Sequence, residues 1–125
     1  MQRLARLVVG VVGALAVIVG LRIWMAPAIA AANLGLAPVG ALGVASLRAD
    51  VAGFFAAAGI LSLAGAIRND RRLLTAPVLL IGLALTGRLV SLVLGGPTPP
   101  QIPPMAIEAV LLVVLASGRQ FLGGA

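Results

Sequence analysis

The chain has 125 residues, of which 62% are hydrophobic and only 10% are charged. A water-soluble domain keeps roughly a quarter of its residues charged, so this composition excludes an ordinary soluble fold and leaves room for one domain. The net charge of +6 comes entirely from arginine, and most of these residues stand at the ends of apolar runs. We therefore expect a lipid bilayer as the partner and no nucleic acid.

The sequence contains no Cys, His, Lys or Tyr. These absences exclude disulfides, thiolate nucleophiles and Lys Schiff bases, together with the commonest metal ligands and general bases. We expect no cofactor and no metal, and the missing catalytic groups favour a protein that is not an enzyme.

The first apolar run, 7–21, follows Arg3 and Arg6, and we predict a membrane span over 5–24. A basic start, an apolar core and the small residues at 28–30 are also typical of a secretory signal peptide. Arg22 stands between that core and the small residues, where a signal peptide rarely carries charge. We therefore favour a span that is retained.

Residues 25–46 are uncharged but interrupted by proline and glycine at positions 27, 35, 38, 40 and 43. Such interruptions argue against a long helix, while the Ala, Leu and Val content argues against exposure to bulk water. We predict an interfacial or re-entrant outer loop, with a short helix around 27–34. Irregular backbone at membrane depth has to be covered by protein.

The second predicted span covers 47–67. Ala49, Gly53 and Ala57 recur along it every four residues, a spacing that allows close helix packing in membranes. The alternative is a chance spacing, because Ala and Gly are common throughout this chain. A charged inner loop follows at 68–72.

The third span is predicted over 73–94, the outer loop over 95–103 and the fourth span over 104–118. The sequence thus predicts an all-α integral membrane bundle of about four transmembrane helices. The outer loops carry no arginine, and positive charge marks the cytoplasmic side, so we expect both termini to be cytoplasmic. The residues that set this orientation are Arg3, Arg6, Arg68, Arg71, Arg72 and Arg119.

Five ionisable residues are not explained by this topology, and all are expected in the outer half of the membrane. They are Arg22, Arg48, Asp50, Arg88 and Glu108. A charge at the bilayer centre costs ~2.5–3.5 kcal/mol on insertion scales, so such side chains turn inward and pair. We predict that Arg88 pairs with Glu108 or Asp50, with Ser91 extending the network on the same helical face.

Two interpretations of this cluster remain open. In the first, it is an ion-pair network that fixes helix register, while Arg22 and Arg48 reach the headgroups. In the second, its excess positive charge forms a pocket for an anionic or polar headgroup from the outer leaflet. Intramembrane ionisable residues are candidates for functional sites in general.

Several short motifs resemble a bacterial family called domain of unknown function 4345. They are Arg48-Ala49-Asp50, Gly53-Phe54-Phe55, Gly87-Arg88-Leu89-Val90-Ser91, Gly96-Pro97 and the later Glu108. The resemblance covers most of the chain and implies a small four-span protein of the bacterial inner (plasma) membrane. It highlights Arg48, Asp50, Arg88, Ser91 and Glu108 but implies no reaction.

Two functions follow as hypotheses. The first is a non-enzymatic accessory or interaction subunit of a membrane complex, which associates with other membrane subunits or with copies of itself. The alternative is an outer-leaflet amphiphile-binding protein or membrane-embedded enzyme. In an enzyme, Asp50 or Glu108 would be the general acid or base and Arg88 would hold negative charge. Transport is disfavoured, because a proton path needs polar groups at several depths.

Overall fold

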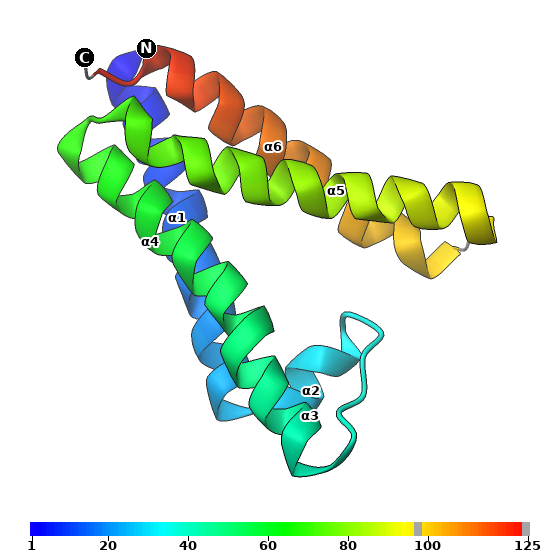
Figure 1. The fold of residues 1–125 in the computed structure, drawn as a ribbon. Helices are drawn as coiled ribbons and strands as arrows, with labels where there is room; N and C mark the ends of the chain where they lie inside the picture. The colour runs from blue at the N-terminus through cyan, green and yellow to red at the C-terminus, as the bar shows by residue number, and fades with distance from the viewer. Residues whose placement is uncertain (97–98, 124–125) are drawn as a thin grey trace.

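The computed structural model describes residues 1–96 and 99–123, and these form helices joined by short turns, with no β-strand among them (Figure 1). Pro97 and Thr98, part of the predicted outer loop, lie outside the described residues. The elements in chain order are α1 (Gln2–Met25), α2 (Pro27–Ala32), α3 (Gly40–Ser46), the π-helical turn η1 (Leu47–Val51), α4 (Ala52–Arg68), the 3₁₀ turn η2 (Arg71–Leu74), α5 (Thr75–Gly95), the 3₁₀ turn η3 (Pro99–Gln101) and α6 (Ile102–Phe121).

Four helical stretches are long and apolar enough to cross a membrane: Gln2–Met25, Gly40–Arg68, Arg71–Gly95 and Pro99–Phe121. The predicted all-α class is therefore confirmed, together with four helices that are long and apolar enough to span a membrane. Helices are expected in such a chain because a lipid-exposed backbone has to satisfy its hydrogen bonds internally.

The second helical stretch begins at Gly40, earlier than the predicted start at 47, because α3 runs through η1 into α4. The glycines that suggested an interruption have other uses. Gly40 begins the helix with a φ of +62°, which glycine adopts without strain. A Cβ on Gly43 would lie 3.0 Å from the backbone of Pro38, so this glycine allows the preceding loop to pack on the helix. The expected short helix around 27–34 is present as α2.

The boundaries of the other helices follow from local chemistry. Ala26 leaves the helical conformation directly before Pro27, because a residue that precedes proline is disfavoured in the α region. Asn69 ends α4 in the left-handed conformation, with a φ of 54°, which Asn tolerates better than most residues. Pro77 in the first turn of α5 and the prolines that open α6 occupy positions where no helical N–H is needed.

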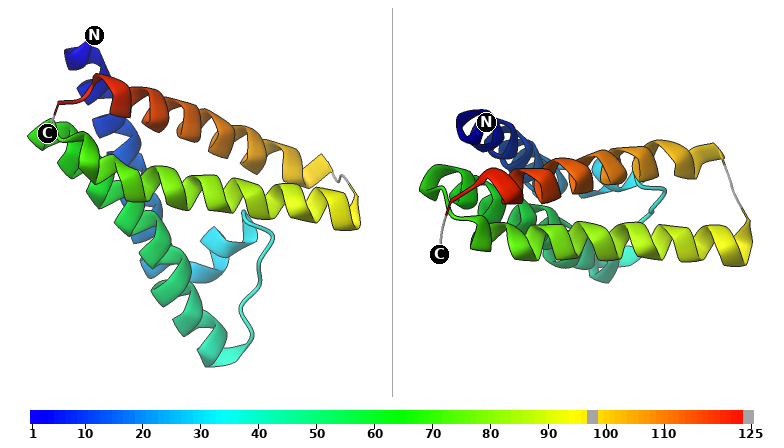
Figure 2. Two further views of the ribbon diagram at one scale, coloured as in Figure 1. Left: turned by 45° about the horizontal axis from the view of Figure 1, so that its top comes forward. Right: turned by 90° about the horizontal axis from the view of Figure 1, so that it is seen from above.

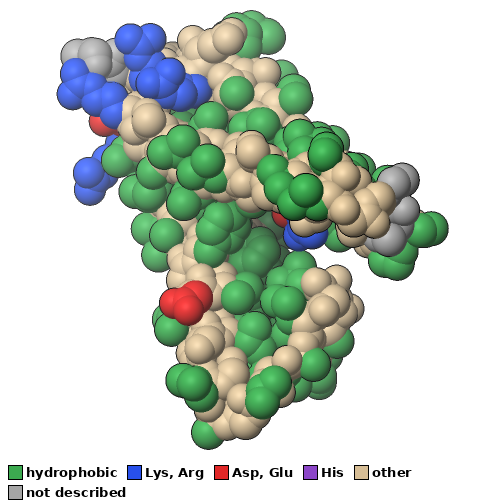
Figure 3. Space-filling model, turned by 45° about the vertical axis from the view of Figure 1, so that its right-hand side comes forward, with side chains coloured by type: hydrophobic (Ala, Val, Ile, Leu, Met, Phe, Trp, Pro, Cys, Tyr) green, Lys and Arg blue, Asp and Glu red, His purple; other side chains and the backbone are tan. Residues whose placement is uncertain are grey.

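The helices form two arms that share one end (Figures 1 and 2). In the first arm α1 packs along α4, and in the second α5 packs along α6. The arms meet where both termini and the α4–α5 turn lie, and they diverge toward the opposite ends (Figure 1). Basic side chains gather at the shared end, whereas hydrophobic side chains cover much of both arms (Figure 3).

Glycine brings α1 and α4 into backbone contact. A Cβ on Gly59 would lie 2.7 Å from both the Gly13 carbonyl oxygen and the Val17 amide nitrogen. A second close contact lies further along the same pair of helices. A Cβ on Gly20 of α1 would lie 3.2 Å from the Ala52 carbonyl oxygen of α4. Small residues that allow such close approach are the usual basis of helix packing in membranes.

The predicted packing stripe lies on a different face of this helix. Ala49 and Ala57 are exposed, and a Cβ on Gly53 would meet nothing within 4 Å among the described residues. The contact with α1 instead uses Ala52 and Gly59. Within this chain, therefore, the stripe of Ala49, Gly53 and Ala57 does not make the α1–α4 contact.

Buried apolar side chains fasten the two arms together at the shared end. They come from the four long helices, from η2 and from the residue that follows α6: Ala5, Val9, Ala66, Leu74, Ile81, Leu115 and Leu122. The C-terminal segment also binds the α4–α5 turn. The Gly123 amide donates to Asn69 Oδ1 at 3.0 Å, and the Arg71 amide donates to the Gly123 carbonyl at 2.9 Å. The vertex of the two arms is thus held by both apolar packing and backbone hydrogen bonds.

Candidate functional site

The second arm contains an ion pair between Arg88 of α5 and Glu108 of α6. Arg88 Nε lies 2.8 Å from each carboxylate oxygen of Glu108. The two side chains are 30% and 18% exposed. Arg88 follows the first residue of α5 by about 20 Å of helix rise, so both charges fall within the apolar length of the arm. Of the two partners that the sequence offered Arg88, the structure selects Glu108.

The other residues of the predicted cluster are not brought to this pair. Arg22 is exposed and lines a groove with α2, on the first arm. Asp50 is exposed and lines a separate groove formed by α3, η1 and the loop before them. Ser91 donates from its hydroxyl to the Gly87 carbonyl, 3.2 Å away within its own helix. Asp50 and Glu108 therefore do not share one site.

Arg48 belongs to a second polar contact, at the far end of the first arm. The Trp24 indole N–H donates to the Arg48 carbonyl at 2.9 Å, and Arg48 Nε donates to the Trp24 carbonyl at 3.1 Å. Arg48 lies in η1, where the wider π-helical turn changes the backbone hydrogen-bond register. This reciprocal contact ties the end of α1 to the start of the second span.

A cavity of about 240 Å³ lies between the arms, close to their vertex. All four long helices contribute to its walls: Val12, Leu15, Ala16 and Val19 from α1, Phe54, Phe55, Ala58 and Ser62 from α4, Ile81 and Ala84 from α5, and Ile107, Glu108, Leu111 and Leu115 from α6. Only Glu108 and Ser62 are polar. Figure 3 shows the hollow between the arms, lined largely by hydrophobic side chains.

The arrangement couples an apolar chamber to a single charged pair. Small-molecule sites are typically concave and mostly apolar, with a few polar groups that fix orientation. Glu108 belongs both to the cavity wall and to the ion pair with Arg88. A ligand with an apolar body and a polar end therefore matches the chemistry of this site.

Sequence reasoning did not single out Ser62 or the cavity role of the Phe54–Phe55 pair. Ser62 is only 1% exposed, and the two phenylalanine rings meet edge to face with centroids 5.4 Å apart. A polar residue in the middle of an apolar span was the available signal for Ser62. Which wall these residues would form could not be read from the sequence, because it depends on the angle between the arms.

Groups of three or more Asp or Glu residues that could hold a metal ion are absent from the described part of the chain. No protein family, no curated protein and no solved structure matches the sequence. The resemblance to domain of unknown function 4345 stays a prediction, and the site is interpreted from its own geometry.

Proposed function

We propose that this protein binds an amphiphile in the membrane, with the apolar body in the cavity between the arms and the polar end at Arg88 and Glu108. The observation that carries the proposal is the cavity itself, an apolar chamber walled by all four long helices and bordered by the ion pair. Composition alone favoured an accessory subunit, which remains the competing function.

The lining of the cavity favours a hydrocarbon chain as its occupant. Of the fourteen residues that line it, all but Ser62 and Glu108 are apolar. An acyl chain or another slender apolar group matches such walls, and a bilayer supplies both from its lipids.

The ion pair supports recognition of a polar end. Among the described residues, Arg88 binds Glu108 through Nε alone. Its two terminal nitrogens donate no hydrogen bond within this part of the chain. Arg can donate to a carboxylate or phosphate through such nitrogens. Glu108 keeps Arg88 oriented and offsets its charge until a ligand binds. This is a binding role, and no reaction is assigned to either residue.

The orientation in the membrane is part of the proposal. Both termini and the α4–α5 turn lie at the basic end (Figures 1 and 3), and positive charge favours the cytoplasmic side. The termini are accordingly cytoplasmic and the cavity opens toward the outer leaflet. By its resemblance to a bacterial family, we place the protein in a bacterial inner membrane.

The test uses the full chain in nanodiscs and a fatty acid that carries a photoactivatable diazirine in mid-chain. Wild-type protein should crosslink at cavity-lining peptides. Ala58→Phe, at a cavity wall, should reduce crosslinking several-fold, whereas Ala57→Phe, the adjacent exposed position, should leave it unchanged. Equal crosslinking of both variants would contradict the proposal.

Two further variants address the polar end. Arg88→Gln and Glu108→Gln should each lower crosslinking while the protein stays folded, as judged by circular dichroism and gel filtration. Native mass spectrometry of the same samples decides the competing function. A stoichiometric protein partner that survives Ala58→Phe, together with no saturable fatty-acid crosslinking, would support the accessory subunit instead.

A further inference from the structure

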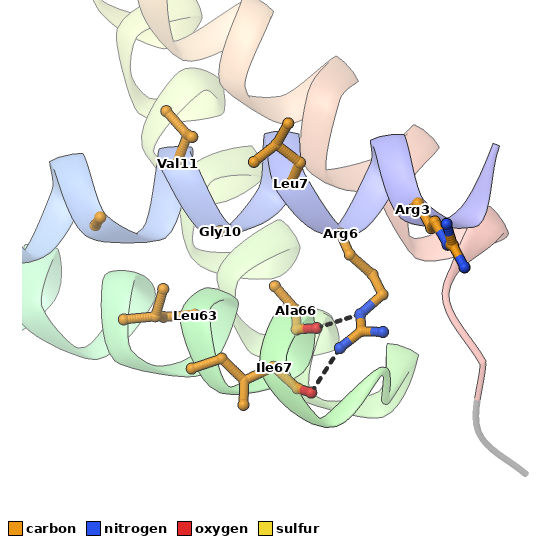
Figure 4. A pocket seen from close by; sticks show the side chains of 9 residues that line it. Arg3, Arg6, Leu7, Gly10, Val11, Leu63, Ala66 and Ile67 are labelled. Carbon is orange, nitrogen blue, oxygen red and sulfur yellow. Dashed lines mark hydrogen bonds between the residues drawn. The ribbon is translucent and has the colours of Figure 1, made fainter.

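A second groove lies on the first arm, at the basic end and away from the cavity between the arms. It measures about 430 Å³ and runs between α1 and α4 (Figure 4). Its lining is divided by chemistry: Arg3 and Arg6 at one end, and the apolar or small residues Leu7, Gly10, Val11, Ala14, Leu63, Ala66 and Ile67 along the rest. The groove therefore has a cationic mouth and an apolar floor.

Arg6 is held in place by the end of α4. Its Nε donates to the Ala66 carbonyl at 2.7 Å and one terminal nitrogen donates to the Ile67 carbonyl at 2.9 Å (Figure 4). The last carbonyls of a helix have no intrahelical partner and carry partial negative charge, so Arg6 satisfies them. The guanidinium is thereby fixed at the mouth of the groove with its charge only partly offset by backbone.

Arg3 lies beside Arg6, three residues earlier on α1 (Figure 4). Within residues 1–96 and 99–123 it forms no ion pair, and its residue is exposed. The first turn of α1 contains no acidic residue, although the positive end of the helix dipole favours one there. Two arginines and a helix start thus create a positive site that this part of the chain leaves without an anion.

Gly10 opens the apolar part of the groove. A Cβ at this position would meet only the Ala66 Cβ, at an ordinary contact distance of 3.6 Å. Helix packing therefore does not require glycine at position 10, in contrast to Gly13 one turn further, where a Cβ would lie 2.7 Å from the Leu63 amide nitrogen. The missing side chain at Gly10 therefore leaves the groove between α1 and α4 open at this position.

We propose that this groove binds one anionic phospholipid, with the phosphate at Arg3 and Arg6 and an acyl chain over Gly10. Charge complementarity selects an anion, and the apolar floor continuing from the mouth selects an anion that carries a hydrocarbon chain. Basic pockets between transmembrane helices are known to hold acidic headgroups on the cytoplasmic side. The site is separate from the cavity between the arms and does not depend on the function proposed for it.

The experiment measures how many lipids stay bound to the full chain in a mild detergent, by native mass spectrometry. Phosphatidylglycerol and phosphatidylcholine of equal chain length are titrated in parallel. One phosphatidylglycerol should be retained in preference to phosphatidylcholine. Arg3→Gln should weaken its binding about fivefold, the factor that corresponds to the ~1 kcal/mol contributed per basic residue near an anionic lipid.

Two other variants distinguish a specific lipid-binding site from general electrostatic attraction of anionic lipid. Gly10→Leu fills the floor and should weaken phosphatidylglycerol binding without changing any charge. Arg119→Gln removes an exposed arginine of α6 that does not line the groove, and it should bind as wild type does. Free inorganic phosphate should not displace the lipid, because the acyl chain contributes to its affinity.

The proposal is overturned if both lipids bind equally, if Gly10→Leu has no effect, or if Arg119→Gln weakens binding as much as Arg3→Gln. If inorganic phosphate alone displaces the lipid, the site at Arg3 and Arg6 binds a free anion, and the proposal is also overturned. Ala58→Phe, which fills the cavity between the arms, should leave phosphatidylglycerol retention unchanged. Failure of either proposal can thus be told from failure of the other.

Discussion

Replacing Gly59 with alanine tests the close contact between α1 and α4. The new Cβ would lie 2.7 Å from two backbone atoms, the Gly13 carbonyl oxygen and the Val17 amide nitrogen. Backbone atoms in two packed helices cannot rotate away as a flexible side chain can, so the helices have to separate. Overpacking of this kind costs about 1–3 kcal/mol.

Gly53→Ala is the matched control on the same helical stretch, because a Cβ there would meet nothing within 4 Å. Apolar helices keep their backbone hydrogen bonds in a membrane even when they come apart, so helix propensity contributes little to either variant. We therefore expect Gly59→Ala to lose about 1–3 kcal/mol, and Gly53→Ala to keep the wild-type free energy of unfolding.

Unfolding is measured in micelles of mild detergent titrated with sodium dodecyl sulfate. Energy transfer between fluorophores on α1 and α4 reports helix separation, and the absence of native cysteine makes paired labelling specific. If the two variants unfold at the same detergent ratio, the glycine contact is not the one that holds the arm together. A larger loss in Gly53→Ala would favour the stripe of Ala49, Gly53 and Ala57 instead.

Two other predictions concern the basic end and the orientation. Asn69→Ala removes a residue that tolerates the left-handed conformation and also removes the hydrogen bond to the Gly123 amide. It should destabilise the fold by about 1–2 kcal/mol in the same titration. Asn69→Gly, which restores the backbone freedom, should recover part of the lost stability. On intact cells, a membrane-impermeant maleimide should label Val39→Cys but not Gln2→Cys, and the reverse pattern would refute cytoplasmic termini.

Much of the architecture is encoded locally in the chain. The apolar runs, the charged turn at 68–72 and the prolines at 27, 103 and 104 predict where helices cross and where they stop, because transfer into lipid and backbone hydrogen bonding are decided residue by residue. The Arg88–Glu108 pair was also accessible to this reasoning. Rise per residue places both at similar depth, and unpaired charge in lipid is costly.

Glycine was misleading where its use depends on a neighbour. In the sequence, Gly40 and Gly43 suggest that no long helix forms there. In the structure, Gly40 begins a helix and Gly43 allows the backbone of Pro38 to pack against it. A one-dimensional pattern does not say whether a glycine ends a helix or lets another segment approach it. The π-helical turn that carries Arg48 and Asp50 is likewise invisible in composition.

The sequence by itself determined the number of helices long and apolar enough to span a membrane, their approximate limits, the basic end and the candidates for the ion pair of Arg88. Only the tertiary structure decided that α4 meets α1 through Gly59 and not through Gly53, and that Arg22, Arg48 and Asp50 stay away from Arg88 and Glu108. In water, hydrophobicity would mark the inner face of each helix. In lipid both faces are apolar, so close fit between backbones selects the face through which α1 and α4 pack.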